Sequence, residues 1–395
     1  MTQGRRTPRS QSCNDTCFGS RARSNGMATT FLLCLLFIGD AVAAMSAGPP
    51  AAARARAPAT SHIYVTNERS GELSVIDAAT HDIVATVALG KRPRGMQFSP
   101  DGSTLYVAIS GSPIDGTASG NVTPPAADLR ADGIGVVDLE THRLVRVLRG
   151  VSEPGQLAVG ADGRRLYVAS QDTGTTVVLD ASDGRLLSTL TVGHQPEGIA
   201  LSPNGRWVYV ASEAEDELTV IDTRDDSVAG AINVGARPRN VLFSAHEPVA
   251  YVACEDGATV DVIDTRLHRV TGRIPIPGKG AAPMGMALSA DGRTLYVATG
   301  RGKTLVAVDT ATRTATAAIE IGPRPWGVTI SADGKRLYSA NGPSNDVSVV
   351  DLGSMTVQRR IAVGQGPWTA VTRRPMTQSM TGLRVGTAET VRANR

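Results

Sequence analysis

Every tyrosine of this 395-residue chain occupies the same position of a repeated phrase. Successive tyrosines are separated by 42, 61, 42, 42, 45 and 42 residues, and an aspartate at the end of the following predicted strand recurs at the same set of spacings. Units of about 42 residues match the four-stranded blades of β-propellers. The two sets are Tyr64, Tyr106, Tyr167, Tyr209, Tyr251, Tyr296 and Tyr338, and Asp77, Asp138, Asp180, Asp222, Asp264, Asp309 and Asp351.

Each unit contains four predicted strands. PRGMQFS (93–99) leads through the turn SPDG into STLYVA (103–108), and ELSVID (72–77) and DIVATVALG (82–90) show the third and fourth strands of a unit. LYVA has no polar alternation, which is typical of a strand covered on both faces. The aromatic content is only 4%, and the 42 glycines suit tight turns. The sequence therefore predicts an all-β chain of antiparallel meanders.

The two ends of the repeat region predict how the ring closes. The region opens with a second strand (63–67) and finishes with an orphan first strand (367–374). Pairing these two completes the seventh sheet and leaves no open edge. We expect residues 61–375 to form a seven-bladed β-propeller of four-stranded antiparallel blades, closed by pairing of the C-terminal strand with the N-terminal blade.

The first 60 residues have a different composition. Five arginines precede the apolar run FLLCLLFI (31–38), and the small residues Ala41, Val42 and Ala43 follow it. This order is typical of a secretory signal, and eight apolar residues are too few to span a bilayer. We expect a signal peptide at 1–43, with Met27 as an alternative start, a flexible linker at 44–60 and a disordered tail at 376–395. The predicted location is periplasmic or secreted, without a transmembrane anchor.

Removal of residues 1–43 takes away five arginines and two aspartates, so the net charge falls from +3 to zero. A neutral chain does not favour general binding to nucleic acid. Only Cys254 remains of the four cysteines, which excludes an intrachain disulfide. We expect Cys254 to be a buried, inert thiol and the mature protein to be a monomer.

At IYVTN (63–67), VIDAATHDIVATVALG (75–90) and LYSANGPSNDVSVVD (337–351), the chain resembles the YVTN-repeat β-propeller family. The resemblance covers residues 61–375 and is closest to secreted members associated with pyrroloquinoline-quinone-dependent oxidation. It implies an exported propeller that serves as a ligand-binding or protein-docking accessory, since relatives include binding modules, lactonases, single-stranded DNA binders and haem-carrying domains. Fold alone does not choose among these activities.

One face of the predicted ring collects the chemically distinctive residues. Connections from the second to the third strand, and from blade to blade, lie on this face, as does a 19-residue insertion between Tyr106 and Asp138. The residue after each repeat proline is expected near the axis there, followed often by a glycine that allows close approach. This column is Arg94, Gly155, Glu197, Arg239, Met284, Trp326 and Trp368. A second column, at the end of the second strand, is Glu68, Gln171, Glu213 and Glu255.

Two interpretations of these columns remain open. In the first, Trp326 and Trp368 plug the channel while Arg94 and Arg239 pair with the glutamates. In the second, the arginines fix a small anionic ligand and the tryptophans supply a stacking wall. A periplasmic protein partner is the other expected ligand of this face.

The enzyme alternative is a lactonase-like hydrolase that uses Glu197, His194 and Arg239, and a further alternative is stacking of single-stranded nucleic acid on the tryptophans. We expect no cofactor and no metal, because no CxxCH, HExxH, GxSxG or EF-hand spacing occurs. The seven repeat aspartates are expected to cap hairpins rather than to act in catalysis.

Overall fold

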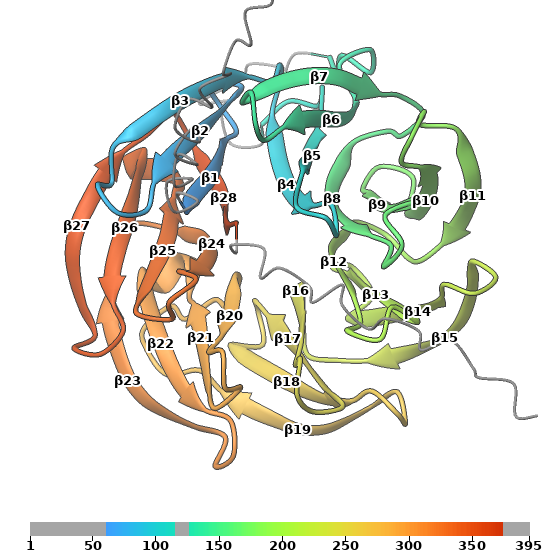
Figure 1. The fold of residues 1–395 in the computed structure, drawn as a ribbon. Helices are drawn as coiled ribbons and strands as arrows, with labels where there is room; N and C mark the ends of the chain where they lie inside the picture. Colours follow the sequence, from blue (N-terminus) through green and yellow to red (C-terminus); the bar gives the residue numbers. More distant parts are fainter. Residues whose placement is uncertain (1–60, 115–125, 374–395) are drawn as a thin grey trace, which may run out of the picture. The chain divides into compact units, whose positions relative to one another are not determined.

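The computed structural model describes residues 61–114 and 126–373. In this part of the chain, 28 strands form seven four-stranded antiparallel sheets arranged around an axis (Figure 1). The predicted seven-bladed propeller is confirmed. None of the described helical segments is long and apolar enough to cross a membrane. The predicted signal peptide, linker and tail, and residues 115–125 of the insertion, lie outside the described residues.

Six blades each use four consecutive strands. In chain order these are β4 (Pro93–Phe98), β5 (Thr104–Ile109), β6 (Gly133–Asp138) and β7 (Arg143–Leu148); β8 (Pro154–Val159), β9 (Arg165–Ser170), β10 (Thr175–Asp180) and β11 (Leu186–Thr191); β12 (Pro196–Leu201), β13 (Trp207–Ser212), β14 (Glu217–Asp222) and β15 (Ser227–Asn233); β16 (Pro238–Phe243), β17 (Val249–Cys254), β18 (Thr259–Asp264) and β19 (Arg269–Pro275); β20 (Met286–Leu288), β21 (Thr294–Ala298), β22 (Thr304–Asp309) and β23 (Thr314–Glu320); β24 (Pro325–Ile330), β25 (Arg336–Asn341), β26 (Asp346–Asp351) and β27 (Thr356–Ala362). Short 3-10 segments, η1 (Gly300–Gly302) and η2 (Gly342–Ser344), join second to third strands in the last two of these blades.

The seventh blade is built from both ends of the propeller. Its order is β28 (Pro367–Thr372), β1 (His62–Asn67), β2 (Glu72–Asp77) and β3 (Ile83–Ala88). β28 pairs antiparallel with β1 through Ile63 opposite Thr372 and Val65 opposite Ala370. The predicted ring closure is confirmed, and both edges that would otherwise be open are paired.

Strand direction gives the ring two distinct faces. The connections from second to third strands and from blade to blade gather at one end, which we call the loop face. The hairpins between first and second strands, and between third and fourth strands, gather at the other end, which we call the turn face. First strands such as β4, β8 and β12 surround the axis, whereas fourth strands such as β7 and β11 lie outermost (Figure 1).

Packing between blades buries the second and third strands. Each of the seven buried apolar clusters takes its side chains from two adjacent blades. LYVA-type strands therefore have apolar neighbours on both faces, while fourth strands such as β3 are mostly exposed. The hydrophobic core lies between the blades rather than on the axis, which leaves the axis free for polar groups.

The recurring tyrosine joins each blade to the next. The Tyr167 hydroxyl donates to Asp226 of the following blade at 2.7 Å, and the Tyr209 hydroxyl lies 2.6 Å from Nδ1 of His268. Tyr64 and Tyr338 make edge contacts with the rings of His142 and His81. These four tyrosines thus contact the same hairpin position of the next blade, and Tyr167 and Tyr209 do so through their hydroxyl groups.

The partner residues stand in the hairpins between third and fourth strands, at left-handed backbone positions. Their φ values are 65° at His81, 51° at His142, 52° at Asp226 and 48° at His268. The repeat aspartate at the start of each hairpin accepts backbone N–H groups within the turn, as Asp77 does from Ala79 and Thr80 at 2.8 and 2.9 Å. The expected capping role is confirmed in all seven hairpins.

Ring closure predicts the outcome of two truncations. A chain that ends at Gln365 lacks β28, so β1 becomes an exposed edge with unpaired N–H and C=O groups. We expect it to lose its cooperative thermal unfolding transition and to aggregate, as measured by circular dichroism and light scattering. A chain that ends at Arg373 keeps β28 and serves as the control. Cooperative unfolding of the shorter chain would contradict the proposed closure.

The histidines between blades predict a pH-dependent stability. Burial lowers the pKa of His62, His81, His142 and His268 below the ordinary value of 6.5. The unfolded chain therefore binds protons more readily just below that value, and the free energy of unfolding falls as the pH decreases through about 6.5.

The double variant His142→Asn/His268→Asn keeps side chains that tolerate a positive φ and removes two of these groups. We expect its melting temperature to drop less than that of the wild type between about pH 7.5 and about pH 5.5. His246→Asn, at an exposed position, is the control. Equal drops in the double variant and the wild type would contradict the assignment.

Candidate functional site

A cavity of about 620 Å³ opens around the axis on the loop face; we call it the funnel. The ends of second strands and the starts of first strands supply its wall. Nine residues that the sequence analysis selected line it: Glu68, Arg94, Gln171, Glu197, Glu213, Arg239, Glu255, Trp326 and Trp368. The structure therefore brings these nine side chains together around one cavity, and the volume of this cavity is within the range of about 300–1,000 Å³ usual for small-molecule sites.

Arg94 is buried at the bottom of the funnel and pairs with Glu197. Nη2 donates to the two carboxylate oxygens of Glu197 at 3.0 and 3.2 Å, and only 5% and 3% of the two side chains is exposed. Nη1 donates to Gln171, whose own amide nitrogen donates to Glu197. Glu68 lies 3.7 Å from Nε of Arg94. Three neighbouring side chains thus compensate the buried guanidinium.

Arg239 forms a second buried cluster. It donates to Glu213 and lies 3.4 Å from Glu255, and all three side chains are less than a tenth exposed. Arg237 reaches the same two carboxylates from the rim, at 3.0 Å from Glu213 and 3.5 Å from Glu255. Arg301 adds an ion pair with Glu255 at 3.5 Å. The glutamates of the second column are therefore matched by arginines.

The two tryptophans lie beside these arginines. The Arg94 guanidinium carbon is 4.8 Å from the ring centroid of Trp368, and that of Arg239 is 5.3 Å from Trp326. The tryptophan centroids are 5.8 Å apart at an interplanar angle of 31°. Glu197, Arg239, Trp326 and Trp368 line both the funnel and a second cavity below it, and we call these four residues the partition.

The geometry corresponds to the first of the two interpretations of the two columns, in which the tryptophans plug the channel and the arginines pair with glutamates. Arg94 and Arg239 are occupied by carboxylates, and Trp368 is only 5% exposed, so it offers no open stacking wall. Trp326 is partly exposed and is the tryptophan that a ligand in the funnel could reach. Met284 is buried and lines the second cavity rather than the funnel.

Two glutamates of the network differ in acidity. Burial alone would raise the pKa of Glu197, but Arg94, Arg239 and Arg92 together lower it. Burial and the neighbouring charge of Glu197 raise the pKa of Glu213. Glu197 is therefore held as the carboxylate, and Glu213 takes up a proton before it as the pH falls.

The sequence analysis missed the residues that precede each repeat proline. Arg92, Glu153, Gln195, Arg237 and Arg324 line the rim of the funnel, and all five have a positive φ between 39° and 55°. This backbone directs their side chains over the cavity. The sequence did contain a signal for these residues. The column one position before the proline is at least as rich in arginine as the column that was selected.

His194 does not belong to the funnel. Its side chain is 84% exposed and its Nδ1 contacts Glu215, and it does not line the cavity. Gln195, the next residue, lines the funnel instead. The structure therefore does not bring His194 together with Glu197 and Arg239, as the hydrolase alternative requires.

A family model described as a YNCE-like beta-propeller matches residues 125–375. The chain belongs to the YNCE-like beta-propeller family. A curated relative, the uncharacterized protein YncE of Salmonella typhi, is 37% identical over 68 residues, which are 17% of this chain and 19% of the relative. The chain thus aligns with about a fifth of that relative's length.

Solved structures show the same fold at low identity. The hydrazine synthase of Kuenenia stuttgartiensis has a TM-score of 0.59 and 21% identity, over 70% of this chain and 88% of that one. A putative 6-phosphogluconolactonase of Bacteroides fragilis has a TM-score of 0.65 and 17% identity, over 79% and 98% of the two chains. These likenesses establish the fold of the YNCE-like propeller and not its activity.

Two further features of the YNCE-like propeller bear on chemistry. Among the described residues no group of three or more His, Cys, Asp or Glu side chains could hold a metal ion. Cys254 is a free thiol and is buried, as expected, and burial raises its pKa to about 12, which disfavours the reactive thiolate.

The buried pairs of the partition region predict strong coupling between Arg94 and Glu197. Removing one partner leaves an uncompensated buried charge, so Arg94→Met and Glu197→Leu should each lower the free energy of unfolding by about 3–5 kcal/mol. The double variant should lose less unfolding free energy than the two single variants together, by about 1–3 kcal/mol, as measured by urea unfolding. In contrast, the exposed Lys91–Asp128 pair should show little or no coupling. Additive losses at Arg94 and Glu197 would argue against the pair.

Proposed function

We propose that the funnel binds a small organic acid and that the protein acts as a binding protein rather than as a catalyst. The observation that carries this proposal is the state of Arg324. Its exposed guanidinium lies 5.0 Å from the ring centroid of Trp326, and it has no acidic partner among residues 61–114 and 126–373. Arg92, Arg94, Arg237 and Arg239 each pair with glutamate.

A second unpaired cation supports an anionic ligand. Arg69 also lines the funnel, is exposed, and has no acidic partner in the described part of the chain. It follows β1, and Arg324 precedes β24, so the two come from neighbouring blades. A carboxylate near Arg324 could accept charge-assisted hydrogen bonds without displacing any glutamate. The anion site that we propose is therefore Arg324 with Arg69, not the sequence-selected Arg94 and Arg239.

The rest of the funnel favours a hydroxylated acid such as a sugar acid. Trp326 offers a partly exposed ring to the apolar face of a ligand, while the carboxylates of Glu68, Glu153 and Glu255 can accept from its hydroxyl groups. One charge-assisted hydrogen bond contributes roughly 1.5–3 kcal/mol and stacking roughly 1–3 kcal/mol. Together these two terms give roughly 2.5–6 kcal/mol before the cost of association, so we expect weak binding, in the millimolar range.

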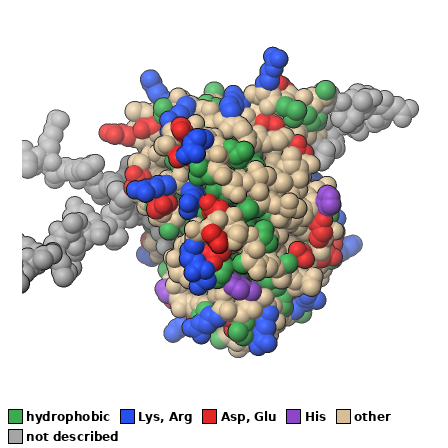
Figure 2. Space-filling view, turned by 90° about the vertical axis from the view of Figure 1, so that its right-hand side faces the viewer, with side chains coloured by type: hydrophobic (Ala, Val, Ile, Leu, Met, Phe, Trp, Pro, Cys, Tyr) green, Lys and Arg blue, Asp and Glu red, His purple; other side chains and the backbone are tan. Residues whose placement is uncertain are grey.

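The state of Glu197 supports binding without turnover. A general base works best with a pKa near the operating pH, whereas the pKa of Glu197 is lowered and its oxygens already accept from Arg94 and Gln171. Stacking of single-stranded nucleic acid is disfavoured because the buried arginines are neutralised. On the side shown in Figure 2, Lys and Arg are interspersed with Asp and Glu and form no extended basic region.

A periplasmic or secreted location, and service to a quinone-dependent oxidation system, remain predictions from the sequence and its family resemblance. An organic acid as ligand is compatible with that setting. A protein partner docking on the loop face is the alternative, and it would use the funnel rim instead of its interior.

Isothermal titration calorimetry with D-gluconate and D-glucuronate tests the proposal. We expect at least one of the two to bind and Arg324→Gln to weaken its binding about 10- to 100-fold, the loss of one charge-assisted hydrogen bond. Added NaCl should weaken the remaining attraction. Arg146→Gln, which makes the same charge change on the exposed outer strand β7, should leave the affinity unchanged.

Two outcomes would contradict the proposal. Either acid could bind equally well to the wild type and Arg324→Gln, which would separate binding from the unpaired arginine. Alternatively neither acid could bind, which would favour a docking surface over a ligand site.

A further inference from the structure

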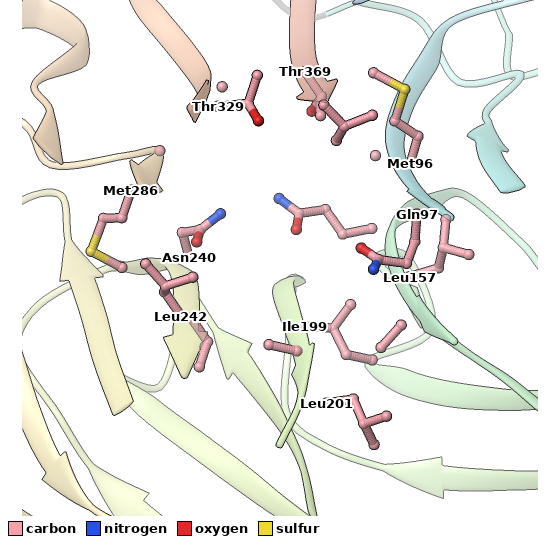
Figure 3. Close-up of a pocket in the computed structure, with 18 of the residues that line it drawn as sticks. Met96, Gln97, Leu157, Ile199, Leu201, Asn240, Leu242, Met286, Thr329 and Thr369 are labelled. Carbon is pink, nitrogen blue, oxygen red and sulfur yellow. The ribbon is translucent and has the colours of Figure 1, made fainter. Parts of the chain in front are cut away.

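The second cavity lies on the other side of the partition and opens toward the turn face. Its volume is about 680 Å³, and turn residues such as Ser99, Pro100 and Pro203 line its outer end. Polar but uncharged side chains from five blades surround it, with apolar side chains between them (Figure 3). We call it the amide chamber, after Gln97, Gln156 and Asn240, which line it together with Thr329 and Thr369.

The amides have no partners within the described protein. In residues 61–114 and 126–373 the side chains of Gln97, Gln156 and Asn240 make no hydrogen bond, and neither does the Thr369 hydroxyl. The Thr329 hydroxyl, in contrast, lies 2.7 Å from that of Thr372. Figure 3 shows the Asn240 amide directed toward the open centre. Three amides and a hydroxyl from four different blades therefore face one cavity with their donors and acceptors unused.

Glycines in the first strands bring these groups close together. A Cβ on Gly198 would lie 2.8 Å from Cα of Asn240, and one on Gly327 would lie 2.8 Å from Cα of Thr369. Real Cβ atoms do not approach so closely, so only glycine allows these neighbouring strands to pack at this distance. The glycine column noted in the sequence thereby sets the diameter of the chamber.

The chamber is unsuited to an ion. Among the described residues, the charged ones that line it are Glu197 and Arg239, which are buried in the partition and already paired. The remaining wall consists of amides, hydroxyls and apolar side chains such as Leu157, Ile199 and Leu242. Transfer of a charged ligand into such a wall would cost free energy without an opposite charge to compensate it.

We propose that the amide chamber binds an uncharged saccharide. Each amide and each sugar hydroxyl both donates and accepts hydrogen bonds, so the two match in any order around the ring. A sugar carries hydroxyl groups around its whole perimeter, which suits polar groups presented from several sides, and its C–H groups suit the leucine and isoleucine side chains between them. A planar heterocycle has fewer such groups and leaves more of the amides without partners.

The partition provides the readout. The chain has three tryptophans, and two of them, Trp326 and Trp368, form one end of the chamber. In a Trp207→Phe parent, tryptophan fluorescence excited where tyrosine does not absorb reports only on Trp326 and Trp368. The probes are D-glucose, D-galactose, maltose and trehalose, none of which absorbs at the wavelengths used. Uracil serves as an uncharged planar comparator, and its binding is followed by calorimetry.

We expect at least one of the four sugars to change the fluorescence saturably. Asn240→Leu and Thr369→Val, each made in the Trp207→Phe parent, should weaken that sugar about tenfold, as expected for the loss of neutral hydrogen bonds. Arg324→Gln, on the other side of the partition, should leave the sugar affinity unchanged. Thermal unfolding checks that each variant is folded, and the conservative Thr369→Val carries the test if Asn240→Leu is not.

Several results would overturn the proposal. These are the absence of a saturable response to all four sugars, unchanged affinity in both chamber variants, and a loss of sugar binding in Arg324→Gln, which would assign the sugar to the funnel. Binding of uracil alone, sensitive to Asn240→Leu, would keep the site but replace the saccharide. Because the funnel proposal is tested by an acid and by Arg324, failure of one proposal is distinguishable from failure of the other.

Discussion

The main-chain pairing of β28 with β1 is the interaction on which the rest of the structure depends. It holds the seventh blade together and so keeps seven first strands around one axis. Apolar clusters between neighbouring blades stabilise the ring from outside the axis. A closed ring of fixed blade number sets the width of the central space, and both cavities exist only because that space is neither filled nor open from end to end.

The second requirement of the structure is electrostatic and concerns the buried charges at the partition. Two guanidinium groups are buried on the axis, where uncompensated charge is expensive, and each is matched by at least one glutamate from another blade. The acids that balance Arg94 and Arg239 leave Arg324 and Arg69 as the cations in the described part of the funnel that have no acidic partner. The distribution of paired and unpaired arginines thus separates the structural polar residues from those available to a ligand.

The fold was predictable because the sequence repeats the same strand pattern seven times. Tyr209 and its six equivalents mark strands in register, and the orphan strand at residues 367–374 requires a partner at the start of the ring. The face that carries the chemically distinctive residues followed from strand direction alone. The state of each arginine did not, because it depends on which glutamate a neighbouring blade presents. Likewise, nothing in GHQPEG indicates that Gln195 turns to the rim and His194 away from it.

The pairing that closes the ring is made of hydrogen bonds and not of a peptide bond, which separates the order of the blades in space from the order in which the chain visits them. Six of the blades are continuous meanders, and in each of them the turn-face connection between the first and second strands is topologically equivalent to the junction where the chain begins and ends. A circular permutant with new termini at one of these connections would retain every sheet. The position of the termini is therefore a property of the gene, and the fold itself has no first blade.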